Sequence, residues 1–150
     1  FDLLFKTVVL TTELALASMK EKQWGRVINV ASVSVKEPLS YLVLSNSIRA
    51  AVVTWAKSLA TEAGAFGITV NSILTGYFNT ERITSLNAKK AKEQGVSEEE
   101  ILMQLEASVP VKRIGDPTEY GYLVDFLASD HSGYITGTQI PIDGGKLNSL

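Results

Sequence analysis

The fold is decided by the stretch Trp24–Glu62, which reads WGRVINVASVSVKEPLSYLVLSNSIRAAVVTWAKSLATE. Its first part, Arg26–Ala31, is a short and mostly apolar run, which is typical of a parallel strand buried on both faces. From about Ser45 the apolar residues recur at helical spacing, and this predicts a long helix over Ser45–Glu62. Strand, loop and helix make half of a βαβ unit, and such units bind ligands beyond the carboxyl ends of their strands.

Polar residues gather at that expected edge. Ser32 directly follows the strand, whereas Ser45 and Arg49 lie one turn apart at the start of the helix and share a face. Ser34 points the same way as Ser32 and is an alternative site hydroxyl. Ser45 is equally suited to cap the helix, and Arg49 to an ion pair at the surface. Any chemistry in this chain is expected between Ser32 and Arg49.

Composition excludes several classes of protein. A length of 150 residues with 45% hydrophobic and 20% charged residues fits one globular domain. The net charge of −2 argues against a nucleic-acid surface. The chain has no cysteine and a single histidine, His131, which argues against disulfides and metal sites. No run approaches the ~18 apolar residues of a membrane span. We therefore expect a cytoplasmic protein without nucleic-acid or membrane partners.

The rest of the chain continues the alternation of strands and helices. Ile68–Leu74 is expected to be a second strand and Gln139–Ile142 a third, with Pro141 placing the last strand near a sheet edge. Alternating apolar runs and helical segments predict an α/β fold with these three strands parallel and neighbouring. The helix Ser45–Glu62 should then cover one face of the sheet.

The other helices are marked by their start signals. Phe1–Met19 has helical periodicity without a start signal, and Lys20–Gln23 is expected to stop it. Thr80 can cap a helix over Glu81–Lys92, and Ser97 with Glu100 forms a capping box for the next one. Asp116 followed by Pro117 starts a last helix whose buried stripe is Tyr120, Leu123, Val124 and Leu127. The pair after Thr80 is polar along one side, which indicates a lid or insertion over the site.

Four segments, in this order, resemble the short-chain dehydrogenase/reductase family over essentially all 150 residues. WGRVINVAS is similar to the strand that leads to the family's catalytic serine, here Ser32. ITVNSILTGYFNT is similar to its VNxIxPGxxxT segment, with Thr75 where proline is usual. VPVKRIGDPTEYGYLVDFLASD follows the family's final helix, and GYITGTQIPIDGG is close to its C-terminal signature.

The resemblance implies a Rossmann-like fold of which this chain is the C-terminal portion. It implies a doubly wound parallel sheet and a single domain over residues 1–150, with the N-terminal, phosphate-binding part of that domain missing. No G-x-G-x-x-G pattern occurs in the chain. The implied cofactor is NAD or NADP, and Gly76, Thr80 and Arg49 are the residues implied to contact it.

The catalytic positions depart from the family pattern. The family's Tyr-x-x-x-Lys pair falls on Ser45 and Arg49. Ser45 is thirteen residues after Ser32, which is the family's usual interval. The position of an active-site asparagine falls on Leu4. Of four catalytic positions only Ser32 is retained, although some members carry a similar LSNxxR-type replacement. Tyr41 is a candidate replacement phenol. Arginine stays charged and can fix a ribose but not relay a proton, as lysine can.

Two functions from different classes remain. The first is an NAD(P)-dependent oxidoreductase acting on an alcohol or carbonyl compound with non-standard catalytic positions. The second is a non-catalytic binding or scaffold module. In either case we expect a homo-oligomer, a dimer or tetramer, built partly on the Ser45–Glu62 helix, where Trp55 and several alanines give more apolar surface than one sheet face can cover. His131 and the charge run Lys89–Glu93 are expected to be exposed.

Overall fold

The computed structural model describes residues 1–149. Its helices are α1 (Thr7–Lys22), α2 (Val43–Ala63), α3 (Glu81–Gln94), α4 (Glu98–Ala107) and α5 (Pro117–Ala128), and its strands are β1 (Gly25–Ser32), β2 (Ile68–Thr75) and β3 (Gln139–Ile142). Short turns of other helical types are η1 (Asp2–Lys6), η2 (Val33–Val35), η3 (Gly64–Phe66) and η4 (Asp130–Ser132). None of the described helices is long and apolar enough to cross a membrane.

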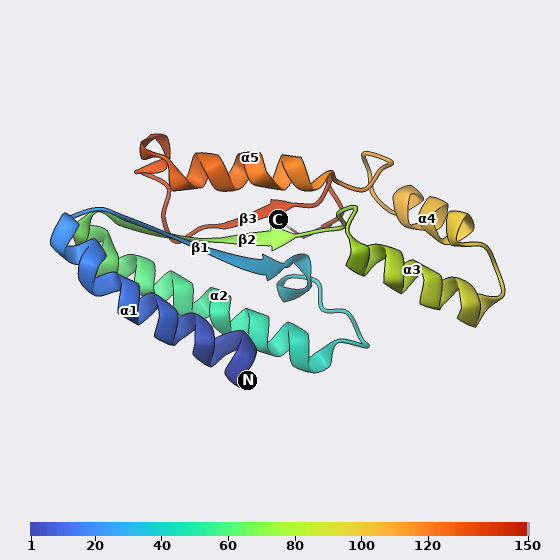
Figure 1. Cartoon of the computed structure of the whole chain (residues 1–150), viewed down its shortest axis with the longest axis horizontal. Helices are drawn as coiled ribbons and strands as arrows, with labels where there is room; N and C mark the ends of the chain where they lie inside the picture. The colour runs from blue at the N-terminus through green and yellow to red at the C-terminus, as the bar shows by residue number, and fades with distance from the viewer. Residues whose placement is uncertain (150) are drawn as a thin grey trace.

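The three strands form one parallel sheet in the order β1-β2-β3. This confirms the predicted fold class, the parallel direction of the strands and the edge position of the strand that contains Pro141. Figure 1 shows α1 and α2 on one side of the sheet and α5 on the other. Helices therefore cover both faces, as in a doubly wound Rossmann-like sheet.

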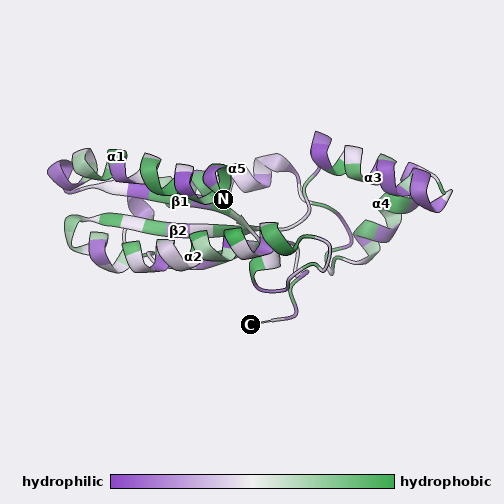
Figure 2. Ribbon diagram, turned by 90° about the horizontal axis from the view of Figure 1, so that it is seen from below, coloured by the Kyte–Doolittle hydropathy of each residue, from purple (hydrophilic) through white to green (hydrophobic). Residues whose placement is uncertain are grey.

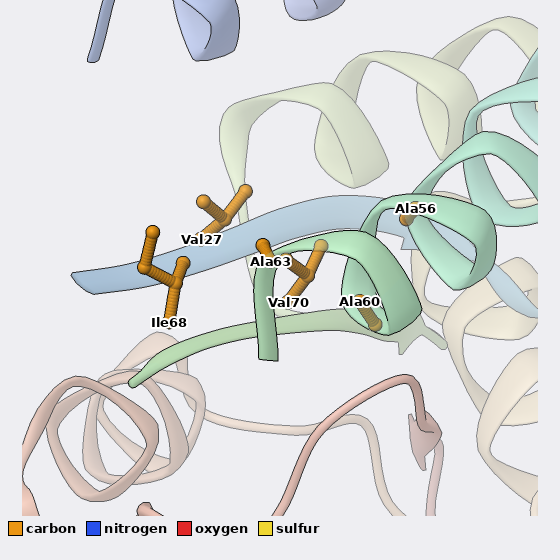
Figure 3. Close-up of a cluster of buried hydrophobic side chains, with 6 residues drawn as sticks. All are labelled: Val27, Ala56, Ala60, Ala63, Ile68 and Val70. Carbon is orange, nitrogen blue, oxygen red and sulfur yellow. The ribbon is translucent and has the colours of Figure 1, made fainter. Parts of the chain in front are cut away.

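The main core lies between α2 and the first halves of β1 and β2 (Figure 3). Small residues on the helix, Ala56, Ala60 and Ala63, let it approach the strands closely. They pack on Val27, Ile68 and Val70, and Trp55, Leu59, Leu16 and Met19 seal the margin. The helix that the periodicity predicted is thus present, and its most buried side chains in this core are small alanines.

The expected burial of the first strand on both faces is wrong. Every residue of β2 but the last is buried, whereas the burial of β1 alternates along the strand. Val30 in β1 remains 62% exposed. In the register of the sheet β1 pairs with β2 on one side only, so the other side of β1 is an open edge within the described residues.

Several helix boundaries differ from the prediction. α2 begins at Val43, so Ser45 lies in its first turn and is not its N-cap; the N-cap is Leu42, which makes no side-chain cap bond. Thr80 does occupy the N-cap position of α3, yet its side chain makes no cap bond either. α1 runs through the predicted stop as far as Lys22 and ends at Gln23 in the left-handed region. The predicted capping box of α4 is formed, and Asp116 caps α5 as predicted; there Glu119 completes a capping box as well.

The helices α3 and α4 pack on each other and extend beyond the ends of the strands (Figure 1). Figure 2 shows that α3 is largely hydrophilic while the strands are largely hydrophobic. Only Ala91 in α3 and Ile101 in α4 are buried. The pair is thus an attachment at the carboxyl side of the sheet and adds little to the main core.

Candidate active site

The three strands end at the same level. Ser32 of β1 is in register with Thr75 of β2, which is in register with Ile142 of β3. The loops that follow the strands therefore start side by side at one edge of the sheet. This edge is where ligands bind in open parallel sheets, and it is where the sequence placed the candidate residues.

Ser32 caps the turn that follows its strand. Its Oγ accepts a hydrogen bond from the backbone N–H of Ser34 at 3.1 Å. The hydroxyl proton of Ser32 is not used in this bond, so the group can still donate to a ligand. Ser34 itself is only 2% exposed, and this burial makes it the weaker alternative for contact with a substrate.

Arg49 reaches from α2 to the end of β1. Its Nη1 donates to the carbonyl oxygen of Val30 at 3.2 Å, which brings the guanidinium to the strand that carries Ser32. Ser45 lies one turn earlier on the same helix and is half-buried. The structure thus brings Arg49 to the strand end as the sequence predicted, with Ser45 near it on the helix.

The buried Asn46, which sequence analysis missed, fixes the loop before α2. Its Nδ2 donates to the carbonyl oxygen of Leu39 at 2.8 Å, and its Oδ1 is buried without a partner in the described residues. The amide thereby ties the loop to the first turn of the helix, although it caps none of the free N–H groups there. An asparagine one position after Ser45 was the available signal.

Position 76 requires glycine because the chain after β2 packs closely against the chain after β3. Its N–H donates to the carbonyl oxygen of Ile142 at 3.0 Å. A Cβ at this position would lie 2.6 Å from Cα of Asp143 and 2.7 Å from its Cβ. The glycine therefore allows the end of β2 to approach the end of β3.

Tyr120 also lies at the carboxyl edge of the sheet, although sequence analysis placed it only in the buried stripe of the last helix. Its hydroxyl is 3.2 Å from Oγ1 of Thr75, the residue that stands where the resemblance expects proline. The ring of Phe78 packs edge-on against that of Tyr120, with ring centroids 5.4 Å apart. Burial raises the pKa of Tyr120, and the Thr75 hydroxyl and the positive charge of Arg49 partly offset this effect.

The loops after β1 and β2 each bring a tyrosine to the edge. Tyr41 is 77% exposed and Tyr77 is half-buried. Burial, and after it the nearby phenol of Tyr41, raise the pKa of Tyr77. Tyr77 also lines a cleft of about 180 Å³ together with Phe78, Val111, Asp143 and Gly144.

The remaining candidates lie apart from this group. Thr80 is exposed at the start of α3, where its Oγ1 is 3.4 Å from the carbonyl oxygen of Phe78. It borders an open cleft of about 540 Å³ with Asn79, Glu81, Thr84 and Ser85. Within residues 1–149, no hydrogen bond or ion pair joins Thr80 to Ser32 or Arg49. Leu4 lies in η1 and is 36% exposed.

Two residues or segments that were expected to be merely exposed are so. His131 is exposed in η4, and Lys89 pairs with Glu93 at 3.8 Å on an exposed helix face. Over the described residues there is no group of three or more histidine, cysteine, aspartate or glutamate side chains that could hold a metal ion.

Comparison with known proteins gives consistent results. A sequence model of the family described as Enoyl-(Acyl carrier protein) reductase matches residues 1–146. The NADPH-dependent reductase BacG of Bacillus subtilis (strain 168) is 32% identical over 147 residues, which cover 97% of this chain and 57% of BacG. An acetoacetyl-CoA reductase of Shinella zoogloeoides is 35% identical over 130 residues, or 87% of this chain and 50% of the reductase.

A solved structure is similar over nearly the whole chain. The crystal structure of YwfH, an NADPH dependent reductase involved in bacilysin biosynthesis, matches with a TM-score of 0.89 and 29% identity. The match covers 95% of this chain and 55% of YwfH. The chain thus spans about half the length of the proteins that it resembles.

Proposed function

The chain belongs to the short-chain dehydrogenase/reductase family, and on this premise we propose that it is part of an NAD(P)-dependent oxidoreductase acting on an alcohol or carbonyl compound. The observation that carries the proposal is the convergence of Ser32 and Arg49 at the carboxyl end of β1. BacG and YwfH are NADPH-dependent reductases, which favours NADPH as the cofactor. When bound, a nicotinamide cofactor supplies the hydride.

We propose further that the chain is the C-terminal portion of one Rossmann-like domain. The open edge of β1 and the 62% exposure of Val30 support this proposal, because an unpaired strand edge can accept a further strand. The relatives are about twice as long as the matched region. The missing part would hold the cofactor phosphates, for which residues 1–150 carry no glycine-rich pattern. An intact mass of the protein purified from its source tests this.

The residues present fit the nicotinamide side of such a cofactor. Arg49 uses one N–H on Val30, and the others of its five donors can hold a ribose or phosphate oxygen. Thr80 would contact the carboxamide, as the family resemblance implies, and the Gly76 turn would lie beside the ring. The donor set of this edge is therefore suited to a polar, oxygen-rich ligand.

Proton transfer is the step in which this chain must differ from most of its family. The hydroxyl of Ser32 can donate to the substrate oxygen while its own oxygen accepts from Ser34. Ser45 can donate a second bond, but a serine hydroxyl ionises far less readily than a phenol and needs a separate base. Arg49 stays protonated and cannot supply the proton. We propose that in carbonyl reduction the alkoxide takes its proton from water, and that in alcohol oxidation the hydroxyl proton of the substrate passes to water.

Arg49→Ala should weaken NADPH binding to the full-length protein by about 1.5–3 kcal/mol, the contribution of a charge-assisted hydrogen bond. This corresponds to a roughly tenfold to hundredfold higher Kd. Arg49→Lys should recover part of the affinity because it keeps the charge. Calorimetry measures the Kd, and thermal unfolding of each variant tests whether the lost bond to Val30 changes stability instead. An unchanged Kd in Arg49→Ala would make Arg49 a structural residue.

Hydride transfer decides between the two candidate functions. NADPH oxidation by the full-length protein should occur with at least one compound of a panel of ketones and aldehydes that begins with acetoacetyl-CoA. The double variant Ser45→Tyr with Arg49→Lys should turn over faster, since it restores the phenol and the amine. Cofactor binding without turnover by either protein would favour the non-catalytic scaffold.

We also propose a homo-oligomer, but on a different surface from the one that the sequence suggested. Trp55 packs against the core, so it does not supply the expected exposed surface of α2. Exposed apolar side chains lie instead at the start of the chain and at the start of α2: Leu3, Leu10, Leu14, Val43 and Leu44. Light scattering of the full-length protein should give a dimer or tetramer at micromolar concentration. A monomer under these conditions would contradict the proposal.

A further inference from the structure

The chain after β3 is bound to the segment that follows the α3–α4 pair. Gly144 and Gly145 turn the chain with positive φ values of 65° and 82°. The N–H of Val111 donates to the carbonyl oxygen of Gly144 at 3.3 Å. A Cβ on Gly144 would lie 2.6 Å from Cγ2 of Val111 and 2.7 Å from Cγ1 of Val109. The turn is therefore tightly packed at the base of α4.

Two further contacts hold the residues after this turn. The carboxylate of Asp143 accepts the N–H of Gly145 at 2.9 Å and that of Leu147 at 2.8 Å. Lys146 extends to the end of α4, where its Nζ donates to the carbonyl oxygen of Ser108 at 3.3 Å. The segment 144–149, here named the strap, thus has a defined path after the sheet ends.

The far end of the strap is held by Glu37 in the loop between β1 and α2. One carboxylate oxygen, Oε1, accepts the backbone N–H groups of Asn148 at 2.7 Å and of Ser149 at 2.9 Å. The bond from Asn148, followed by that from Ser149, lowers the pKa of Glu37. Glu37 is therefore ionised near neutral pH, and bonds to an ionised acceptor are the stronger ones.

The strap begins beside the carboxyl end of β2. β2 lies between β1 and β3, and Asp143, directly before the strap, lies against Gly76 at the carboxyl end of β2. That end carries Thr75 and Gly76 and is the edge to which the site was assigned above. The start of the strap, Gly144, also lines the 180 Å³ cleft beside Tyr77.

The same loop that Glu37 ties to the strap carries Tyr41, which is exposed, and then leads into Ser45 in the first turn of α2. We propose that the strap is one wall of the substrate pocket, and that Glu37 is a positioning residue that holds the β1–α2 loop against this wall. This rests on the proposed function. The bonds between Glu37 and the strap affect substrate binding, because they order the β1–α2 loop around the carbonyl compound. They leave the cofactor contacts of Arg49 unchanged.

The test compares Glu37→Ala and Glu37→Gln with wild type in the full-length protein. Glu37→Ala removes the acceptor, whereas Glu37→Gln keeps an acceptor oxygen but no charge. We expect Glu37→Ala to raise KM for the carbonyl compound that is turned over, acetoacetyl-CoA being tried first, about tenfold, with kcat and the NADPH Kd nearly unchanged. Glu37→Gln should show an intermediate KM. Glu62→Ala, an exposed glutamate on α2, is the matched control and should leave KM unchanged.

Hydrogen exchange is the second readout and needs no substrate. The amides of Asn148 and Ser149, and that of Leu42 in the loop, should exchange faster in Glu37→Ala and not in Glu62→Ala. Faster exchange of the two tail amides with unchanged KM and unchanged Leu42 would overturn the positioning role, because the carboxylate would then hold the tail alone. Unchanged exchange of all these amides in Glu37→Ala would show that Glu37 does not hold the strap. A wild type without any turnover would contradict the proposed function and the effect of Glu37 on KM. The exchange data would still decide whether Glu37 holds the strap.

Discussion

Gly76→Ala should destabilise the fold by about 3 kcal/mol, at the upper end of the range for overpacked positions. The added methyl group would lie 2.6 Å from Cα of Asp143 and 3.1 Å from the carbonyl oxygen of Ile142. These are backbone atoms or atoms next to them, so no flexible side chain can move out of the way. The ends of β2 and β3 must separate, and the hydrogen bond between Gly76 and Ile142 lengthens. Denaturant unfolding at equilibrium measures the loss.

Gly64→Ala is the matched control. Nothing lies within 4 Å of a Cβ at this position, and its φ of −58° suits any residue. The same chemical change should therefore be neutral there, or stabilise by a few tenths of a kcal/mol through the unfolded state. Equal destabilisation by both substitutions would show that the packing at Gly76 is not the cause. Gly76→Ala should also speed the exchange of the strap amides, because the added methyl group would press on Asp143, whose carboxylate accepts the N–H groups of Gly145 and Leu147.

Leu74→Ala should cost about 2–5 kcal/mol, the range for a large side chain removed from a rigid core. Leu74 is 0% exposed and belongs to the small cluster of Ala31 and Val53, with Val33 and Val35 packed against it. Its neighbours belong to β1, α2 and the turn between them, so they cannot all close on the vacated space. The cavity would open directly beneath Thr75. Thermal unfolding should show a fall in Tm of roughly 5–15 °C.

Leu14→Ala tests whether the loss at Leu74 comes from burial. Leu14 is 81% exposed on α1, and alanine is the best helix former. In a monomeric sample this change should stay within about 0.5 kcal/mol. A similar cost at both positions would mean that Leu14 is buried in an assembly, which would support the proposed homo-oligomer rather than the core argument.

Local patterns were enough for the architecture. Apolar runs predicted the three strands to within a residue or two at each end, and helical periodicity predicted α2. Connections of this length with a helix between strands make the strands parallel. The capping boxes at Ser97 and Asp116 were equally readable, because each involves only neighbours along the chain.

The start of α2 shows where local signals ended. Ser45 was a plausible N-cap by residue type, yet the helix begins at Val43, and Asn46 in its first turn ties down the preceding loop through Leu39. No cap pattern describes that contact, which spans seven residues. The same limit applies to Arg26, whose buried guanidinium donates to the carbonyl oxygens of Ser129 and Gly67 on distant loops.

The sequence by itself determined the order and direction of the strands, the helix that covers them, and the edge at which Ser32, Arg49 and Gly76 gather. Only the tertiary structure decided which groups meet there: Thr75 with Tyr120, which are 45 positions apart, and Glu37 with Asn148, which are 111 apart. The physical reason is range. Periodicity and capping depend on contacts within a few residues, whereas a hydrogen bond between two loops depends on where separate elements come to rest against one another.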